Sequence, residues 1–218
     1  MLEETVGRKK ELVRTAAPPP QSSTPEPTTV KPVHEPTGAS TAAEGIVESQ
    51  KSLPELPAEM LLEGIPLGMQ ERNLSCELQS ASDLAWYYGK PYTWKELFLR
   101  VGHDPGGNPH KGFVGRSLDD CPGLLYPNGY GVYAEPIAMA LRQLGLPAEV
   151  HYRKSAAWLR EQIALRRPVM VWATGGMVER PVEEWVASDG AVVEGVRGEH
   201  TFLVIGYSPD GGRSFREA

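Results

Sequence analysis

Three residues, two of them close together and the third far along the chain, have the chemical types needed for nucleophilic attack on a carbonyl. Cys76 lies in the first turn of a predicted helix, where the helix dipole and free backbone N–H groups favour a thiolate. Gln70 lies six residues earlier, and its amide could donate to a developing oxyanion together with the backbone N–H of Cys76. His200 opens an apolar strand and is the best general base among the five histidines. The pattern predicts a thiol hydrolase site.

Other interpretations of these residues are more ordinary. A cysteine at a helix start is more often a small buried residue, and Cys121 could form a disulfide with Cys76 that would silence the site. A polar loop between these cysteines offers further metal-ligand types, but its spacing matches no compact metal motif. We therefore expect a solvated loop there and predict no metal and no organic cofactor. The residues concerned are His103, Asp104, His110, Asp119 and Asp120.

Composition excludes several classes of partner. The chain has 22 Lys and Arg against 28 Asp and Glu, a net charge of −6, which argues against a nucleic-acid partner. The glycine-rich segment 106–112 lacks the Gly-Lys-Ser/Thr ending of a phosphate loop. No run of eighteen apolar residues exists, so we expect no integral membrane segment. Met1–Arg14 also lacks the apolar stretch of a secretory signal.

The chain divides into two regions of different composition. Residues 1–57 contain nine of the 20 prolines and none of the 5 Trp, 8 Tyr and 4 Phe, so we expect a disordered Pro/Ser/Thr-rich linker or tail. Residues 58–218 are long enough to form one domain with its own core. A tether of this kind suggests an extracellular or cell-envelope location, whereas the absence of a signal leaves a cytoplasmic location open.

Hydrophobic periodicity within residues 58–218 predicts helices first and strands later, which favours an α+β domain. The expected helices are Leu74–Tyr88, Thr93–Val101, Glu135–Leu144 and Ala156–Leu165. The expected strands are Ala148–Tyr152, Pro168–Ala173 and His200–Tyr207. Between the second and third helices lies a long loop rich in Gly, Pro and Asp, and we expect it to form one wall of a cleft.

The order of five motifs resembles the papain-like cysteine peptidases related to the double-glycine leader, or bacteriocin-processing, peptidases. This is cysteine peptidase family thirty-nine, and the likeness is to its stand-alone, non-transporter branch. The resemblance implies an α+β papain-like fold, in which an N-terminal catalytic helix packs on an antiparallel sheet bearing the histidine. It also implies that Cys76 is the nucleophile, His200 the base and Gln70 the oxyanion donor. The motifs are Gln70–Glu77, Asn108–Gly115, Gly129–Pro136, Arg167–Trp172 and Glu199–Tyr207.

One residue of that family pattern is missing. In the family, an Asp or Asn on the strand after the histidine strand orients the imidazole. Ser208–Gly212 predicts a turn, and if Tyr207 pairs with Arg213, His200 faces position 220, beyond Ala218. We therefore expect a domain truncated at its C-terminus, an orienting residue from another segment, or a catalytic dyad.

Two functions follow from these observations. The first is a cysteine peptidase-like hydrolase that cleaves a peptide or related amide bond in a peptide or protein substrate through a thioester intermediate. The alternative is a non-catalytic peptide-binding or recognition module that retains the peptidase fold, because an imidazole without its orienting residue loses most of its power as a base. Oligomeric state and side-chain preference are not predicted by any motif.

Overall fold

The computed structural model describes residues 56–209 and 215–217. The linker predicted for residues 1–57 lies almost entirely outside these residues, and the predicted boundary at 57/58 remains a prediction. In the described part of the chain, no helix is long and apolar enough to cross a membrane.

Four helices form where hydrophobic periodicity predicts them, and no boundary differs by more than two residues. They are α1 (Cys76–Tyr87), α2 (Trp94–Val101), α3 (Ala134–Gln143) and α4 (Ala156–Ala164). Side chains that accept hydrogen bonds from free N–H groups explain two of the starts. Thr93 begins α2 in a capping box with Glu96, and the Ser155 side chain accepts from the backbone N–H of Trp158 before α4.

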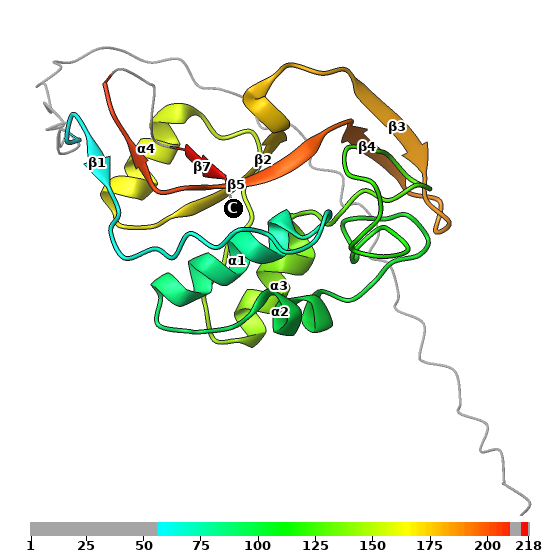
Figure 1. The fold of residues 1–218 in the computed structure, drawn as a ribbon. Coiled ribbons are helices and arrows are strands. Elements are labelled where there is room, and N and C mark those ends of the chain that lie inside the picture. Colours follow the sequence, from blue (N-terminus) through cyan, green and yellow to red (C-terminus); the bar gives the residue numbers. More distant parts are fainter. Residues whose placement is uncertain (1–55, 210–214, 218) are drawn as a thin grey trace, which may run out of the picture. The chain divides into compact units, whose positions relative to one another are not determined.

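The helices α1, α2 and α3 share one hydrophobic core and lie on the same side of the strand β5 (Glu199–Val204) (Figure 1). Small residues on α1, Ala81 and Ala85, are fully buried, which allows the neighbouring helices to approach closely. Leu97 of α2 and Ala140 of α3 are also fully buried in this core. The core therefore fixes α1, and with it the position of Cys76.

The central sheet has three antiparallel strands in the order β2 (Val169–Thr174), β5 (Glu199–Val204) and β7 (Phe215–Glu217). Within it, His200 is paired with Ala173 on β2. α1 packs directly against β5, so the cysteine helix covers the strand that carries the histidine. The class of the fold is thus mixed helix and sheet, and the strands of the central sheet follow the helices in sequence as predicted.

The predicted register of the last hairpin is wrong by one residue. Phe202 pairs with Glu217, and this register, if continued, places position 219 rather than 220 opposite His200. The difference arises because β5 ends at Val204 instead of running on to Tyr207. The two residues of β6 (Gly206–Tyr207) pair with a separate short strand, β1 (Met60–Leu61), which the sequence did not predict.

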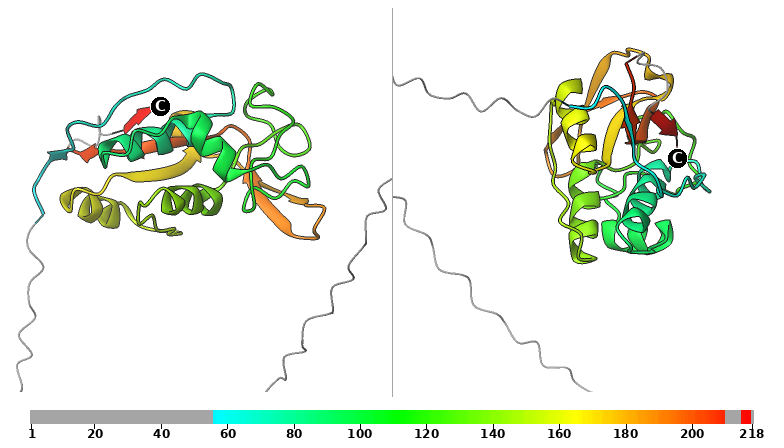
Figure 2. Two further views of the ribbon diagram at one scale, coloured as in Figure 1. Left: turned by 90° about the horizontal axis from the view of Figure 1, so that it is seen from below. Right: turned by 90° about the vertical axis from the view of Figure 1, so that its left-hand side faces the viewer.

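A second hairpin, β3 (Val182–Val186) with β4 (Val192–Val196), was also not predicted from the sequence. It follows a short 3-10 turn, η1 (Gly175–Met177), and extends past one end of the central sheet, away from α4 (Figure 2).

The strand expected at Ala148–Tyr152 is wrong, because none of its residues is in a strand. Ala148 instead donates to Leu146 and accepts from the Arg142 side chain.

Candidate active site

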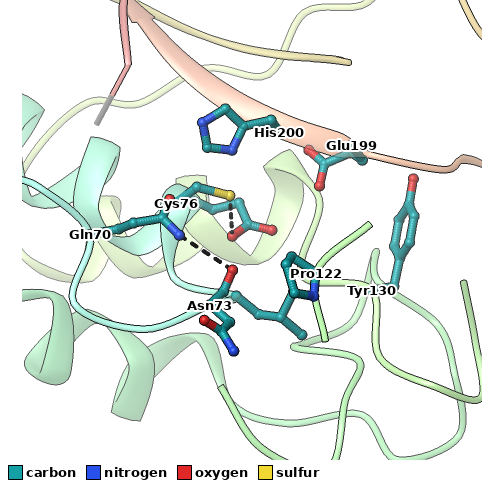
Figure 3. A pocket seen from close by; sticks show the side chains of 9 residues that line it. Gln70, Asn73, Cys76, Pro122, Tyr130, Glu199 and His200 are labelled. Carbon is teal, nitrogen blue, oxygen red and sulfur yellow. Dashed lines mark hydrogen bonds between the residues drawn. The ribbon is translucent and has the colours of Figure 1, made fainter. Parts of the chain in front are cut away.

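The three residues predicted to perform the chemistry line one pocket of about 220 Å³ (Figure 3). Gln70 comes from the segment before α1, Cys76 is the first residue of α1, and His200 lies on β5. His200 is more than a hundred residues from Gln70 and Cys76 in sequence, and the packing of α1 on β5 brings them together.

A tight turn before α1 presents Cys76 to the pocket. Ser75 occupies the N-cap position of α1, but its side chain makes no capping hydrogen bond to the helix. Its hydroxyl instead accepts from the backbone N–H of Arg72 at 3.2 Å and donates to the Arg72 carbonyl at 3.0 Å. The Cys76 side chain is almost fully buried behind this turn, with 6% of the residue exposed.

A buried polar contact fixes the segment that carries Gln70. The backbone N–H of Gly68 donates to Asp83 on α1 at 3.1 Å, and the other oxygen of Asp83 accepts from Gln79 at 2.9 Å. A Cβ atom at Gly68 would lie 2.0 Å from the amide nitrogen of Gln79, so only glycine fits there. The segment therefore runs directly along α1 toward Cys76.

The Gln70 amide faces the pocket but is already used within its own loop. Its Nε2 donates to the carbonyls of Arg72 at 2.9 Å and Asn73 at 3.3 Å. Its Oε1 is buried and has no hydrogen-bond partner. In this arrangement Gln70 closes the turn before Cys76, and its role as an oxyanion donor remains a prediction.

His200 lies over the Cys76 side chain (Figure 3). Its ring packs edge-on against Phe202, two residues further along the same face of β5, with ring centroids 4.9 Å apart at 86°. Phe202 is itself buried, so this contact limits the rotation of the imidazole.

The long loop between α2 and α3 forms one wall of the pocket, as predicted, through Pro122 and Tyr130. It is tied to the turn before α1 by backbone and side-chain contacts. Leu74 donates to the Leu118 carbonyl at 2.8 Å, and the Asn73 amide donates to the Asp119 carbonyl at 3.0 Å. The wall loop is therefore hydrogen-bonded to the turn that positions Cys76.

Sequence reasoning missed two acidic residues in this pocket, each adjacent in sequence to a predicted catalytic residue. Glu77 is 1% exposed; its Oε2 accepts from the Cys76 thiol at 3.2 Å and its Oε1 from the backbone N–H of Val132 at 2.9 Å. Strand alternation places Glu199 on the opposite face from His200, yet both line the pocket. The Oε1 of Glu199 is buried and accepts no hydrogen bond within 3.5 Å from the described residues.

These acids reverse the expected ionisation of the nucleophile. Burial raises the pKa of the Cys76 thiol well above its usual value, and the nearby carboxyl groups of Glu77 and Glu199 raise it further. Burial also raises the pKa of Glu77 and, more strongly, that of Glu199. Burial and these carboxyl groups thus favour the neutral thiol and oppose the thiolate that the helix start was predicted to favour.

The disulfide considered from the sequence, between Cys76 and Cys121, is not formed in this structure. Both cysteines are free thiols, and Cys121 is exposed while Cys76 is buried. His110 instead contacts the carboxyl group of Glu135 at 2.9 Å. Within residues 56–209, no three His, Cys, Asp or Glu side chains are grouped so that they could hold a metal ion.

Comparison with known proteins gives one informative result. A scan against protein-family profiles finds no match, and a search of curated proteins finds none either. Among solved structures, the chain is similar to a crystal structure provisionally described as a C39-like peptidase from Bacillus anthracis. The TM-score is 0.55 with 24% sequence identity, over 69% of this chain and 78% of that one. This likeness shows that the two chains share a fold.

Proposed function

We propose that the protein is a cysteine peptidase-like hydrolase that cleaves a peptide or related amide bond through a thioester on Cys76. The observation that carries the proposal is the meeting of Cys76, His200 and Gln70 in one pocket. The description of the structural neighbour as a C39-like peptidase supports it. We assign the fold to the papain-like arrangement of the stand-alone branch of that family.

In the first half of the reaction, His200 accepts the Cys76 proton as the sulfur forms a bond to the carbonyl carbon. The resulting oxyanion is stabilised by the backbone N–H of Cys76, which lies in the first helical turn, where N–H groups have no intrahelical acceptor. The Gln70 amide becomes a second donor if it releases one of its loop carbonyls. The C–N bond then breaks, and the His200 imidazolium protonates the departing amine.

In the second half, water attacks the thioester carbonyl while His200 accepts a proton from it. The C–S bond breaks, the carboxylic acid product leaves, and the proton held by His200 returns to the sulfur. All atoms are accounted for by the substrate, one water molecule and these side chains.

A second hollow of about 370 Å³ continues from the first and gives an extended substrate room beside the nucleophile. The two hollows share Tyr130 and Glu199. The second is lined by aromatic groups including Tyr133 and Trp172, and the Trp172 indole is fixed by donating to the Val132 carbonyl at 2.9 Å. Such a surface suits the side chains of a peptide that passes Cys76.

Hydrolysis of a pooled peptide library, followed by mass spectrometry, tests this function. We expect cleavage products with the wild-type chain and none with Cys76→Ala or His200→Ala. Cys121→Ala is the matched control and should cleave as the wild type does, because that thiol is exposed outside the pocket. Peptide binding with no products from any form would replace this function with a non-catalytic recognition module.

A further inference from the structure

The carboxyl group of Glu199 has no role in the proposed reaction, although it lies next to the site. Its side chain points into the space between His200 and Tyr130 (Figure 3). Its Oε1 is buried and accepts no hydrogen bond within 3.5 Å from the described residues. Thr201, the next residue on the same face of β5, has a hydroxyl that makes no such bond either. A buried carboxyl group without a donor is unfavourable, so the arrangement favours a ligand that brings donors of its own.

Glu199 connects the pocket of Cys76 to the second hollow, since it lines both of them. A second acidic residue of that hollow is Glu194, on β4. Among the described residues that line the two hollows, none is Lys or Arg. Arg180 lies beside Gly198, yet it lines neither hollow. The second hollow therefore has two carboxyl groups and no cation to pair with them.

The tyrosine hydroxyls of the second hollow are already used within the protein. Tyr133 donates its hydrogen to the Glu194 carbonyl at 2.6 Å. In the 2.8 Å contact between the two tyrosine hydroxyls, Tyr130 must therefore be the donor. Tyr130 in turn accepts from the backbone N–H of Val196 at 3.3 Å. Each hydroxyl has one hydrogen, so neither has one left for Glu199.

The other side-chain donors of the second hollow are used in the same way. The Trp172 indole donates to the Val132 carbonyl at 2.9 Å, and the Thr174 hydroxyl donates to the Val178 carbonyl. With the two tyrosines, these are all the side-chain donors that line this hollow. The hollow thus has carboxyl acceptors for which its own side chains supply no hydrogen.

Aromatic side chains complete the second hollow. It is lined by Tyr130, Tyr133 and Trp172, and the faces of such rings attract cations. The β3–β4 hairpin packs closely against them, because a Cβ atom at Gly195 would lie 2.5 Å from the Trp185 ring and 3.0 Å from the Tyr130 hydroxyl. Close packing and hydrogen bonds therefore hold these rings in place before any ligand binds.

We propose that Glu199 and the second hollow form a subsite for a cationic side chain, the Lys or Arg of a peptide substrate. The ammonium or guanidinium group donates to Glu199 and favours the charged form of its carboxyl group, and exposed Glu194 adds a second negative charge. Because Glu199 lines both hollows, this Lys or Arg lies close in sequence to the bond that Cys76 attacks. That the peptide is a substrate rests on the proposed function, whereas cation binding does not.

Two labelled pools of mixed-sequence peptides test the subsite with the full chain. The pools are identical except at one fixed position, which is Arg in the first and citrulline in the second. Citrulline keeps the shape and N–H donors of Arg but has no charge. Fluorescence anisotropy measures binding, and mass spectrometry measures the rate of cleavage. We expect the Arg pool to bind about tenfold more tightly and to be cleaved faster, as for a hydrogen bond to a charged group.

Glu199→Gln should remove most of the preference for Arg over citrulline. The ratio between the two pools is the quantity to compare, because a general loss of binding or activity affects both pools equally. Glu194→Gln should reduce the ratio less, since that residue is exposed. Glu183→Gln is the matched control and should keep the wild-type ratio, because this carboxyl group pairs with Arg197 on the same hairpin and lines neither hollow.

Equal binding of the two pools by the wild type, or a preference that Glu199→Gln leaves unchanged, would overturn the inference. If Glu199→Gln shows no cooperative thermal unfolding, the wild-type ratio and Glu194→Gln decide. Preferred binding of the Arg pool without cleavage in any form would reject only the proposed function. Equal binding and equal cleavage of the two pools would reject only the subsite, and neither binding nor cleavage of any pool would reject both.

Discussion

Two groups of acidic residues in this protein behave in opposite ways. In the pocket, Glu77 and Glu199 lie close to each other away from water, and burial raises the pKa of both. On the turn of the β3–β4 hairpin, Asp189 contacts the Lys111 ammonium at 2.5 Å and accepts from the Asn108 amide at 2.9 Å. These contacts, that with Lys111 foremost, hold the pKa of Asp189 well below its usual value.

The comparison shows that the charge of a carboxyl group is decided by its surroundings and not by its residue type. Asp189 has a cation and solvent, so its charged form is favoured. Glu77 has a backbone donor and a thiol but no Lys or Arg among the described residues that line the pocket, so its charged form is less favoured than that of Asp189. The hairpin turn therefore favours a charged carboxylate, whereas burial in the pocket disfavours one.

The largest effect is expected from Glu77→Ala, measured by chemical unfolding at mildly acidic pH where the carboxyl group is protonated. Truncation leaves a cavity and deprives the buried Val132 N–H of its acceptor, so the free energy of unfolding should fall by about 3 kcal/mol. Asp189→Ala is the exposed counterpart and should cost far less. Equal losses in the two variants would mean that burial does not distinguish these acids.

The second largest effect is expected from Gly131→Ala, which should lower the free energy of unfolding by about 2 kcal/mol in the same measurement. Its Cβ atom would meet Glu77 Oε1, which its hydrogen bond to Val132 holds in place. The matched control is Gly64→Ala, at φ of 80° with no atom within 4 Å of the new Cβ, which tests backbone strain alone. If the free energy of unfolding falls equally in the two glycine variants, the contact with Glu77 does not contribute to the loss of stability in Gly131→Ala.

The pH dependence of stability should differ between the two groups in sign. Glu77 and Glu199 bind a proton more tightly in the folded chain, so their contribution to stability is present at low pH and is lost as pH rises above the usual carboxyl range. The slope for one such group is about 1.4 kcal/mol per pH unit. Thermal midpoints (Tm) of the wild type should therefore fall relative to Glu77→Gln as pH rises, and parallel curves would contradict this.

The smallest effect is expected from Asp189→Asn. Its lowered pKa means that the stabilising contribution is present above the usual carboxyl pKa and is lost as pH falls. Because the ion pair with Lys111 is exposed, the change in Tm at neutral pH should be slight and should disappear at high salt. A large decrease that persists in high salt would show that the hairpin turn depends on more than this charge.

The candidate site could be predicted in part because residue type and position within a helix or strand can be recognised in short segments of the sequence. Cys76 at a helix start and His200 at a strand start are positions that periodicity alone reveals, and the structure places both in one pocket. Glu77 enters the sequence prediction only as the last residue of the motif that contains Cys76. Its contact with Val132, fifty-five residues away, depends on how the wall loop folds onto α1.

Strand pairing was the weakest part of the sequence prediction, for a related reason. Alternation at Ala148–Tyr152 fits a strand, but no strand forms there. Conversely, β1 and the β3–β4 hairpin were missed, because short strands carry little periodic signal and are stabilised by their partners. The one-residue difference in the β5–β7 register has the same origin, since β6 leaves the sheet to pair with β1.

By itself, the sequence determined the four helices, the order of helices before strands, and which residues have the chemistry of a thiol hydrolase. Hydrophobic spacing and capping residues act within a few positions, so they can be read from the chain directly. Only the tertiary structure decided the ionisation of Cys76, because that depends on burial and on Glu199, 123 positions away in sequence. Desolvation and distant carboxyl groups are properties of the folded pocket, and here they oppose the thiolate that the local helix dipole favours.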